Sequence, residues 1–162
     1  PEAQLDRFLL HIQVGYPNAE AELAILRLVR GEEKGSKLKA AATVELLTAA
    51  RNEITERVRI AENVERYIVD LVAATRAPKA LDAELAQWIE VGASPRASLG
   101  LDKVSRARAY LAGRDYVSAD DVRSVAPSVL RHRLILGYEA KAKGISADQV
   151  VARLLDRVAI AG

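Results

Sequence analysis

Residues 91–101 read VGASPRASLGL, and this stretch organises the fold that the remaining sequence predicts. Ser94 is a favoured helix N-cap, because its hydroxyl can accept a hydrogen bond from an unpaired backbone N–H of the first turn. Pro95 suits the first helical position, where a missing N–H costs nothing and the fixed φ already fits. The stretch therefore predicts a helix that begins at Ser94 and runs to about Ala112, where Gly113 stops it.

Arg96 lies in the first turn of this predicted helix. A cation there faces the positive end of the helix dipole, which is unfavourable by on the order of 0.3–1 kcal/mol. The same geometry becomes useful if an anion docks at that helix end, since the backbone N–H groups and the guanidinium then converge on it. One hypothesis is therefore a phosphate-sensing arginine, and the alternative is a solvated arginine on an ordinary helix.

The composition is that of a helical globular domain. Of the 162 residues, 50% are hydrophobic, 28% are charged and only 4% are aromatic, so we expect one domain with an aliphatic core. The chain has no cysteine, and its two histidines, His11 and His132, lie far apart in the sequence, so no metal site is predicted. The net charge of +2 is too balanced to indicate nucleic-acid binding.

The ends and the hydropathy suggest a piece of a longer, non-membrane protein. No apolar run approaches the roughly 18–20 residues that a bilayer span requires, so we expect no membrane segment. No signal peptide is visible, because the sequence opens with PEAQ in place of a basic and then apolar segment. The sequence begins at Pro1 and contains no methionine.

Residues 8–14, FLLHIQV, alternate between two faces and predict a β-strand. It is the only convincing strand in the sequence. A lone strand cannot satisfy its own backbone N–H and C=O groups, so we expect its sheet partners to lie in sequence upstream.

After this strand the pattern is helical, and the fold class is predicted to be mainly α, with six or seven helices in a bundle. The predicted helices cover residues 18–30, 43–57, 62–74, 82–90 and 94–112, a segment from Ser118 that should end before Pro127, and a last helix from Ser146. Residues 58–61 are expected to form a short extended link. The inner stripe of the helix from Ser94 is predicted to be Leu101, Val104, Ala107 and Leu111.

Few residues point to catalysis. The sequence has no GxxxxGK[ST] phosphate-binding loop and no GxSxG nucleophile motif. Arg7 lies immediately before the predicted strand, where it could project towards a neighbouring molecule. The alternative is an Asp6–Arg7 surface pair worth under about 1 kcal/mol. The basic cluster Arg131-His132-Arg133 favours a solvated face or a subunit contact over a nucleic-acid site, since it lacks interleaved aromatic residues.

Five motifs, in this order, resemble the C-terminal part of MoxR-type AAA+ ATPases. They are PEAQLDRF (1–8), VGYP (14–17), GASPRA (92–97), GRDYV (113–117) and PSVLRHR (127–133). The resemblance covers essentially the whole chain. It implies a helical-bundle lid domain over residues 18–162, preceded by residues 1–17 as the end of an α/β ATPase core that contributes one short strand.

The resemblance also implies roles for four residues. Arg7 matches the arginine finger, which acts in trans at the ATP site of the adjacent subunit. Arg96 matches sensor 2, which contacts the γ-phosphate of its own subunit's nucleotide, with Ser94 and Pro95 in the same nucleotide-binding motif. An arginine delivered to a loose phosphoryl-transfer transition state is worth roughly 10³–10⁵ in rate, and its bidentate guanidinium suits that role better than lysine.

For the whole protein, the resemblance implies a cytoplasmic homo-oligomeric ring that uses ATP and Mg²⁺ in chaperone-like remodelling or maturation of client proteins. It also implies von Willebrand factor A-type partners and, in some cases, metal-cofactor insertion. Because the P-loop and Walker B motifs are absent, we expect this chain alone neither to hydrolyse nor to bind ATP tightly, and to hold no cofactor. The alternatives are a non-enzymatic helical interaction module that uses residues 131–133 for acidic partners and, less favoured, a helical nucleic-acid binder.

Overall fold

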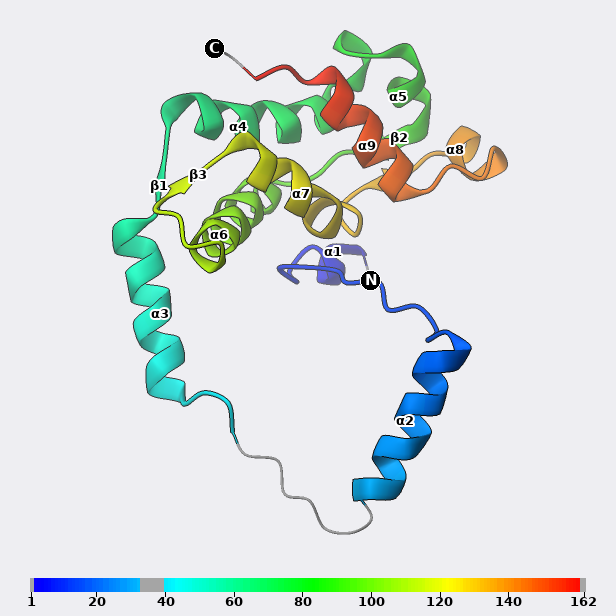
Figure 1. The fold of residues 1–162 in the computed structure, drawn as a ribbon. Helices are drawn as coiled ribbons and strands as arrows, with labels where there is room; N and C mark the ends of the chain where they lie inside the picture. The colour runs from blue at the N-terminus through cyan, green and yellow to red at the C-terminus, as the bar shows by residue number, and fades with distance from the viewer. Residues whose placement is uncertain (1, 33–39, 161–162) are drawn as a thin grey trace. The chain divides into compact units, whose positions relative to one another are not determined.

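Helices joined by short strands make up the part of the chain that the computed structural model describes, residues 2–32 and 40–160 (Figure 1). The elements are α1 (Glu2–Leu5), α2 (Ala19–Glu32), α3 (Val44–Arg57), β1 (Arg59–Ile60), α4 (Glu62–Arg76), the 3₁₀ turn η1 (Pro78–Ala80), α5 (Ala83–Trp88), β2 (Ile89–Val91), α6 (Arg96–Leu111), β3 (Tyr116–Val117), α7 (Ala119–Leu130), β4 (Ile135–Leu136), α8 (Tyr138–Ala142) and α9 (Ala147–Arg157). The predicted mainly α fold class is confirmed. None of the described helices combines the length and the hydropathy that a membrane span requires.

The chain forms two compact units. The first unit comprises Pro1–His11 and Asn52–Gly162, and the second comprises Ile12–Arg51. In the second unit α2 begins as predicted, because the Asn18 side chain accepts a hydrogen bond from the Ala21 N–H at 2.8 Å. The large apolar side chains of α2 are exposed in this structure: Leu23, Ile25, Leu26, Leu28 and Val29.

The core of the first unit lies between α4, α6, α7 and α9 (Figure 1). As the composition predicts, its fully buried large side chains are mostly aliphatic: Leu71, Leu85, Leu101, Leu130 and Leu154, with Val58, Val72, Val122, Val129, Val150 and Val151, beside Tyr67. Among the described elements, α6 and α7 pack on each other most extensively. Gly100 permits their approach, because a Cβ at this position would lie 3.0 Å from Cγ1 of Val129.

The first unit contains two very short two-stranded sheets, which connect its loops by backbone hydrogen bonds. β1 pairs with β3 in parallel, and β2 pairs with β4 in antiparallel. The extended link predicted at residues 58–61 is confirmed by β1. The other three strands contain only two or three residues each, too few to show a period of two in the sequence. The helix predicted over 82–90 accordingly ends at Trp88, where β2 begins.

The strand predicted at residues 8–14 is wrong for this structure, in which residues 8–18 have no helix or strand. A strand depends on a neighbouring ladder for its backbone hydrogen bonds, and no described strand runs beside this segment. Instead the His11 N–H donates to the carbonyl of Ser128 at the end of α7, at 2.9 Å. The apolar side chains beyond His11 stay exposed, Val14 by 91%.

The end of α7 also differs from the prediction. Its start is confirmed, since Ser118 and Asp121 form a capping box, but the helix continues through Pro127 to Leu130. A proline inside a helix removes one backbone hydrogen bond. Burial compensates here, because Ala126, Val129 and Leu130 on either side of the proline are fully buried.

In α6 the predicted inner stripe is right at Leu101 and wrong at Leu111, which is 85% exposed. The residues that α6 buries are mostly small: Ala97, Gly100, Leu101, Ser105 and Ala109. Close packing on α7 explains this choice, because large side chains would hold the two helices apart. Gly113 ends the helix as predicted, with a φ of 72° that a glycine adopts readily.

Candidate functional site

The start of α6 is built around Ser94. Its hydroxyl oxygen accepts a hydrogen bond from the N–H of Arg96, the first residue of α6, at 3.2 Å. The same hydroxyl lies 2.9 and 3.0 Å from the two carboxylate oxygens of Asp6, to which it donates. The Ala97 N–H donates to the Ser94 carbonyl at 2.9 Å. The helix itself begins at Arg96, with Pro95 at the N-cap position and no capping hydrogen bond from a side chain there, so the N-cap predicted at Ser94 is one residue early although Ser94 does bind the first turn.

The charge at this helix start is unusual within the described part of the chain. Each of the helices α2 to α5 and α7 to α9 has an acidic residue in its first turn, whereas α6 has none and begins with Arg96. The Arg96 side chain is exposed and forms no hydrogen bond or ion pair with the residues that the structure describes. A helix N-terminus with an added, unpaired cation favours an anionic ligand.

The loop that precedes α6 is fixed by the end of α4. The Ala93 N–H donates to Oγ1 of Thr75 at 2.9 Å, and Arg76 donates to the Ala93 carbonyl at 3.1 Å. Gly92 packs against the backbone at the end of α4, where an added Cβ would lie 2.3 Å from the Thr75 carbonyl oxygen. Sequence reasoning missed Thr75 and Arg76, because both occupy ordinary positions at a helix end.

Arg7 lies in the turn that follows α1. Its side chain is exposed and makes no hydrogen bond or ion pair with any described residue. The alternative Asp6–Arg7 pair does not form. The Asp6 carboxylate instead pairs with Arg133, whose Nε lies 3.3 Å from Oδ1, and accepts from Ser94. The guanidinium of Arg7 is thus left available to another molecule.

Arg133 binds the backbone on both sides of Arg7. Its Nη2 donates to the carbonyls of Asp6 (3.3 Å) and Phe8 (2.5 Å), and its Nη1 donates to those of Leu9 (3.3 Å) and Val129. We call Arg133 together with the carbonyls of residues 6, 8 and 9 the Arg133 clamp. Only 2% of the Arg133 side chain is exposed, so the prediction of a solvated face is wrong for this residue.

The charge of Arg133 is buried but compensated. Burial lowers the pKa of the Arg133 guanidinium from its usual value, the carboxylate of Asp6 raises it, and the nearby charge of Arg96 lowers it again. The clamp and the start of α6 therefore lie within electrostatic reach of each other.

The other two residues of the basic cluster also hold the N-terminal segment. Nε2 of His132 lies 3.0 Å from the carbonyl oxygen of Phe8, so this nitrogen carries the proton, and burial lowers the pKa of the ring. Arg131 donates to the His11 carbonyl at 2.9 Å and pairs with Asp148 at 2.8 Å. The side chains of residues 131–133 thus all bind the backbone of residues 6–11. The basic surface that the alternative hypothesis offers to acidic partners is therefore largely occupied by the chain itself.

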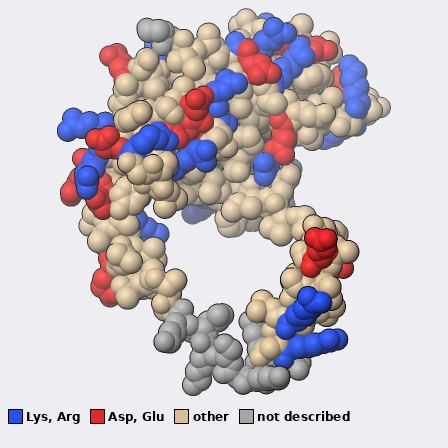
Figure 2. Space-filling view, viewed as in Figure 1, with Lys and Arg blue, Asp and Glu red and all other residues tan. Residues whose placement is uncertain are grey.

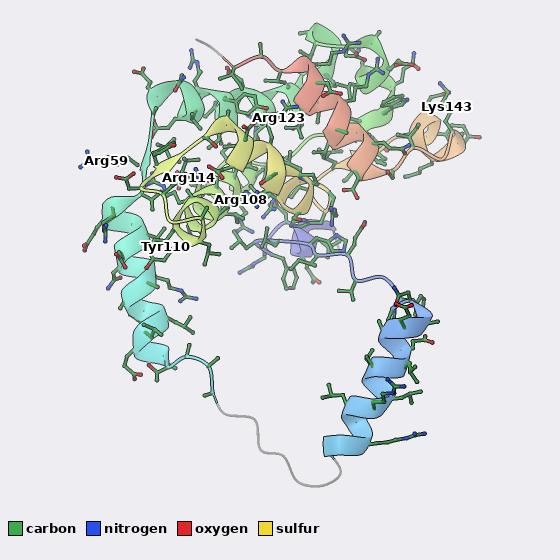
Figure 3. The ribbon with its side chains drawn as sticks, in the orientation of Figure 1. Arg59, Arg108, Tyr110, Arg114, Arg123 and Lys143 are labelled. Atoms are coloured by element: carbon green, nitrogen blue, oxygen red, sulfur yellow. The ribbon has the colours of Figure 1, made fainter. Side chains whose placement is uncertain are left out.

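A hollow lies at the other end of α6, away from Ser94. It has a volume of about 400 Å³ and is lined by polar groups that include Tyr110 and Arg114 (Figure 3). Tyr110 donates to Glu53 at 2.7 Å, and Arg114 donates to both carboxylate oxygens of Asp121 at 2.6 and 2.7 Å. Because these groups already have partners within the fold, the hollow offers a ligand no free charge from them. On the face that Figure 2 shows, basic side chains are interspersed with acidic ones, so no extended patch of one charge is seen there.

Comparison with known proteins agrees with this architecture. A family model of the AAA lid domain matches residues 82–154. The chain is 42% identical to Chaperone MoxR1 of Mycobacterium tuberculosis, over 99% of this chain and 42% of that protein. It is 32% identical to Protein MoxR of Paracoccus denitrificans, over 90% of this chain and 46% of that protein. A crystal structure of a candidate ATPase from Cytophaga hutchinsonii superimposes with a TM-score of 0.93 at 40% identity, over 100% of this chain and 49% of that one.

The helical fold and the family match define residues 82–154 as an AAA lid domain. The chain belongs to the MoxR family of AAA+ ATPases, as its sequence motifs predict. It spans less than half the length of these relatives, between 42% and 49%.

Proposed function

We propose that this chain is the lid-bearing part of a MoxR-type AAA+ ATPase. The whole protein would form a cytoplasmic homo-oligomeric ring and couple ATP hydrolysis, with Mg²⁺, to the remodelling or maturation of client proteins, von Willebrand factor A-type proteins among its partners. Residues 1–17 would end the ATPase core and residues 18–162 would form the lid. The names of the relatives support this proposal, since one is named a chaperone and one solved neighbour is described as a candidate ATPase.

The observation that carries the proposal is the exposed guanidinium of Arg96 at the start of α6, which pairs with no described residue. As sensor 2, Arg96 would contact the γ-phosphate of its own subunit's nucleotide, while Ser94 and Pro95 set the helix start. The backbone of the preceding loop is anchored to α4 through Thr75 and Arg76. A phosphate contact at Arg96 would therefore be passed to the lid as a rigid-body rotation.

Arg7 would act as the arginine finger of the neighbouring subunit's ATP site. Its exposed side chain has no hydrogen-bond or ion-pair partner among the described residues, while the adjacent backbone is held by the Arg133 clamp. These two features suit a side chain that must reach a fixed point on another molecule. In the transition state of phosphoryl transfer, charge spreads over the γ-phosphate oxygens, where a guanidinium binds well.

The first test measures ATP hydrolysis by full-length protein that carries Arg7→Ala or Arg96→Ala. We expect Arg7→Ala to reduce kcat by roughly 10³-fold or more. Arg66→Ala is a matched control, because Arg66 is also exposed and lies on α4, and we expect it to keep wild-type activity. Full activity of Arg7→Ala would contradict the finger assignment, and full activity of Arg96→Ala would contradict the sensor assignment.

Mixed rings test whether Arg7 acts in trans. Arg7→Ala subunits are combined with subunits whose own phosphate-binding loop is inactivated and whose Arg7 is intact. We expect part of the activity to return, since an intact finger then reaches an intact site. No recovery over all mixing ratios would contradict action in trans.

The 162-residue chain alone has no GxxxxGK[ST] loop. We expect the purified chain to show no ATP turnover and no tight ATP binding by isothermal calorimetry. Turnover that persists after removal of contaminating ATPases would overturn this part of the proposal.

A further inference from the structure

The geometry points to Arg133 as a positioning residue for Arg7, holding the finger segment in the conformation that the neighbouring subunit requires. This inference rests on the proposed role of Arg7. It adds Arg133, which is far from Arg7 in the sequence, as a residue on which the position of the Arg7 side chain depends.

The pattern of hydrogen bonds around Arg7 carries the inference. Arg133 donates to the carbonyl immediately before Arg7, at Asp6, and to the two that follow it, at Phe8 and Leu9. Residues 6–9 belong to no helix or strand, so these carbonyls have no acceptor role in regular secondary structure. A donor that bridges both sides of one residue fixes the backbone from which its side chain projects.

Arginine is suited to this task in a way that lysine is not. The guanidinium presents five N–H donors in a rigid planar fork, and here two of its nitrogens serve four carbonyls. A lysine ammonium has a single nitrogen and cannot reach both sides of Arg7 in the same way. The fork is itself fixed, because Arg133 is buried and its Nε lies 3.3 Å from the Asp6 carboxylate.

The consequence for catalysis follows from geometry. The Arg7 side chain makes no hydrogen bond or ion pair with a described residue that would direct it, so its direction depends on the backbone at residues 6–9. A misplacement of about 1 Å in a reacting group costs roughly 10²-fold in rate. Loss of the clamp should therefore reduce kcat at the neighbouring site, while the KM for ATP changes little.

The experiment uses full-length protein with Arg133→Gln, Arg133→Lys or Arg123→Gln. Arg123 is the matched control: it lies on α7 (Figure 3), donates to the Leu155 carbonyl at 2.6 Å and to the Tyr67 hydroxyl at 3.2 Å, and makes no described contact with residues 6–11. Each variant is first compared with wild type for ring assembly and thermal unfolding. ATP hydrolysis is then measured in uniform rings and in rings mixed with subunits that have an inactive phosphate-binding loop and an intact clamp.

We expect uniform Arg133→Gln rings to lose about 10²-fold in kcat, with Arg133→Lys equal or intermediate and Arg123→Gln close to wild type. In mixed rings, Arg133→Gln subunits should recover activity, because a neighbour with an intact clamp supplies the finger to their own intact site. A purely structural role would damage the variant's own site, and mixing would not restore it.

Two results overturn the inference alone. One is wild-type kcat in assembled Arg133→Gln rings, and the other is a loss of kcat that mixing does not restore although Arg7→Ala in the same assay is restored. If Arg133→Gln fails to assemble, Arg133→Lys, which keeps the charge beside Asp6, decides by the same two criteria. Full activity of Arg7→Ala would instead show that the proposed function fails, which separates the two failures.

Discussion

The hydroxyl of Ser94 donates to the carboxylate of Asp6 at 2.9 Å, joining two residues that lie 88 positions apart in the sequence. Arg7 follows Asp6 directly, and Arg96 lies two residues beyond Ser94. The two exposed arginines of the candidate site are therefore carried by backbone segments that share one carboxylate. That carboxylate also pairs with the buried Arg133, so a single ionic group connects the start of α6 with the clamp.

Removal of the Ser94 hydroxyl should weaken this connection. We expect Ser94→Ala to reduce the free energy of unfolding of the chain by about 1 kcal/mol, the typical net contribution of a hydrogen-bonded side-chain hydroxyl. Denaturant unfolding followed by circular dichroism measures this change. Ser94→Thr keeps a hydroxyl and should lose less than half as much. Equal losses in the two variants would show that the hydroxyl does not contribute through these hydrogen bonds.

Gly92 should tolerate no side chain. A Cβ there would lie 2.3 Å from the Thr75 carbonyl oxygen and 2.7 Å from the Arg76 nitrogen, and both are backbone atoms that cannot move aside cheaply. We expect Gly92→Ala to destabilise the chain by about 1–3 kcal/mol, as overpacking does. The same substitution should also displace the loop that leads to Arg96.

Gly15→Ala provides the control for this prediction. Gly15 has nothing within 4 Å of an added Cβ, so the substitution should change the unfolding free energy by no more than about 0.5 kcal/mol. The measurement is the midpoint of denaturant unfolding for both variants. A Gly92→Ala midpoint equal to that of Gly15→Ala would mean that the loop and α4 separate without loss of stability.

The helices were predictable because their signals are local. Asn18, Ser118 and Ser146 cap the helices that their own sequence neighbours form. The wrong strand at residues 8–14 has the opposite origin, since its alternation is local but a strand also needs a partner that the described chain does not provide. The strands β2 and β4 were missed because a pair such as Ile89 and Leu136 shows no periodicity at all.

The residues of the candidate site also differ in whether a local sequence signal could reveal them. Ser94, Pro95 and Arg96 could be recognised from one short stretch, because an N-cap and a first-turn cation are sequence neighbours. The basic cluster at residues 131–133 was visible, but its partners were not. The contact between Arg133 and Asp6 spans 127 residues, and no local pattern in a single sequence specifies such a pair.

The docking of residues 6–11 should weaken in mild acid through His132. Burial lowers the pKa of this ring, and the charge of Arg133 and the neighbouring His11 lower it further, against opposing effects of the Phe8 carbonyl and Asp6. The folded state therefore binds fewer protons than the unfolded state, so stability falls as the pH drops below about 6.5 towards the lowered pKa. Above that range His132 is neutral in both states and has no effect.

Hydrogen exchange at the His11 amide, which donates to Ser128, reports this docking directly. We expect its protection to fall between pH 7.5 and 5.5, after correction for intrinsic exchange. In His132→Gln the amide side chain can still donate to Phe8 but does not titrate, so its protection should be nearly constant over this range. The same decline in both proteins would assign the pH dependence to another group.

Asp121 is a buried charged position at which substitution should be costly. It is 3% exposed, accepts two hydrogen bonds from Arg114 and caps α7 through Ser118, and Arg114 above all lowers its pKa. Arg108 lies 3.5 Å away (Figure 3). Asp121→Ala leaves the guanidinium of Arg114 without its carboxylate partner. We expect the free energy of unfolding to fall by about 3 kcal/mol, the lower end of the range for a broken buried ion pair, because the Arg114 side chain is 29% exposed.

The control for Asp121 is Asp120→Ala at the adjacent, exposed position in the same first turn. Asp120→Ala keeps the capping box and the pair between Asp121 and Arg114. Its free energy of unfolding should therefore fall only by the contribution of a single first-turn charge, about 0.3–1 kcal/mol. Denaturant unfolding at pH 7 compares the two variants. Because Arg114 lowers the pKa of Asp121, the difference between the two variants should persist at about pH 3.5, where an ordinary aspartate, with a pKa of about 3.9, is mostly protonated. A difference that disappears at that pH would mean that the carboxylate titrates as an exposed group and that the pair with Arg114 does not hold in solution.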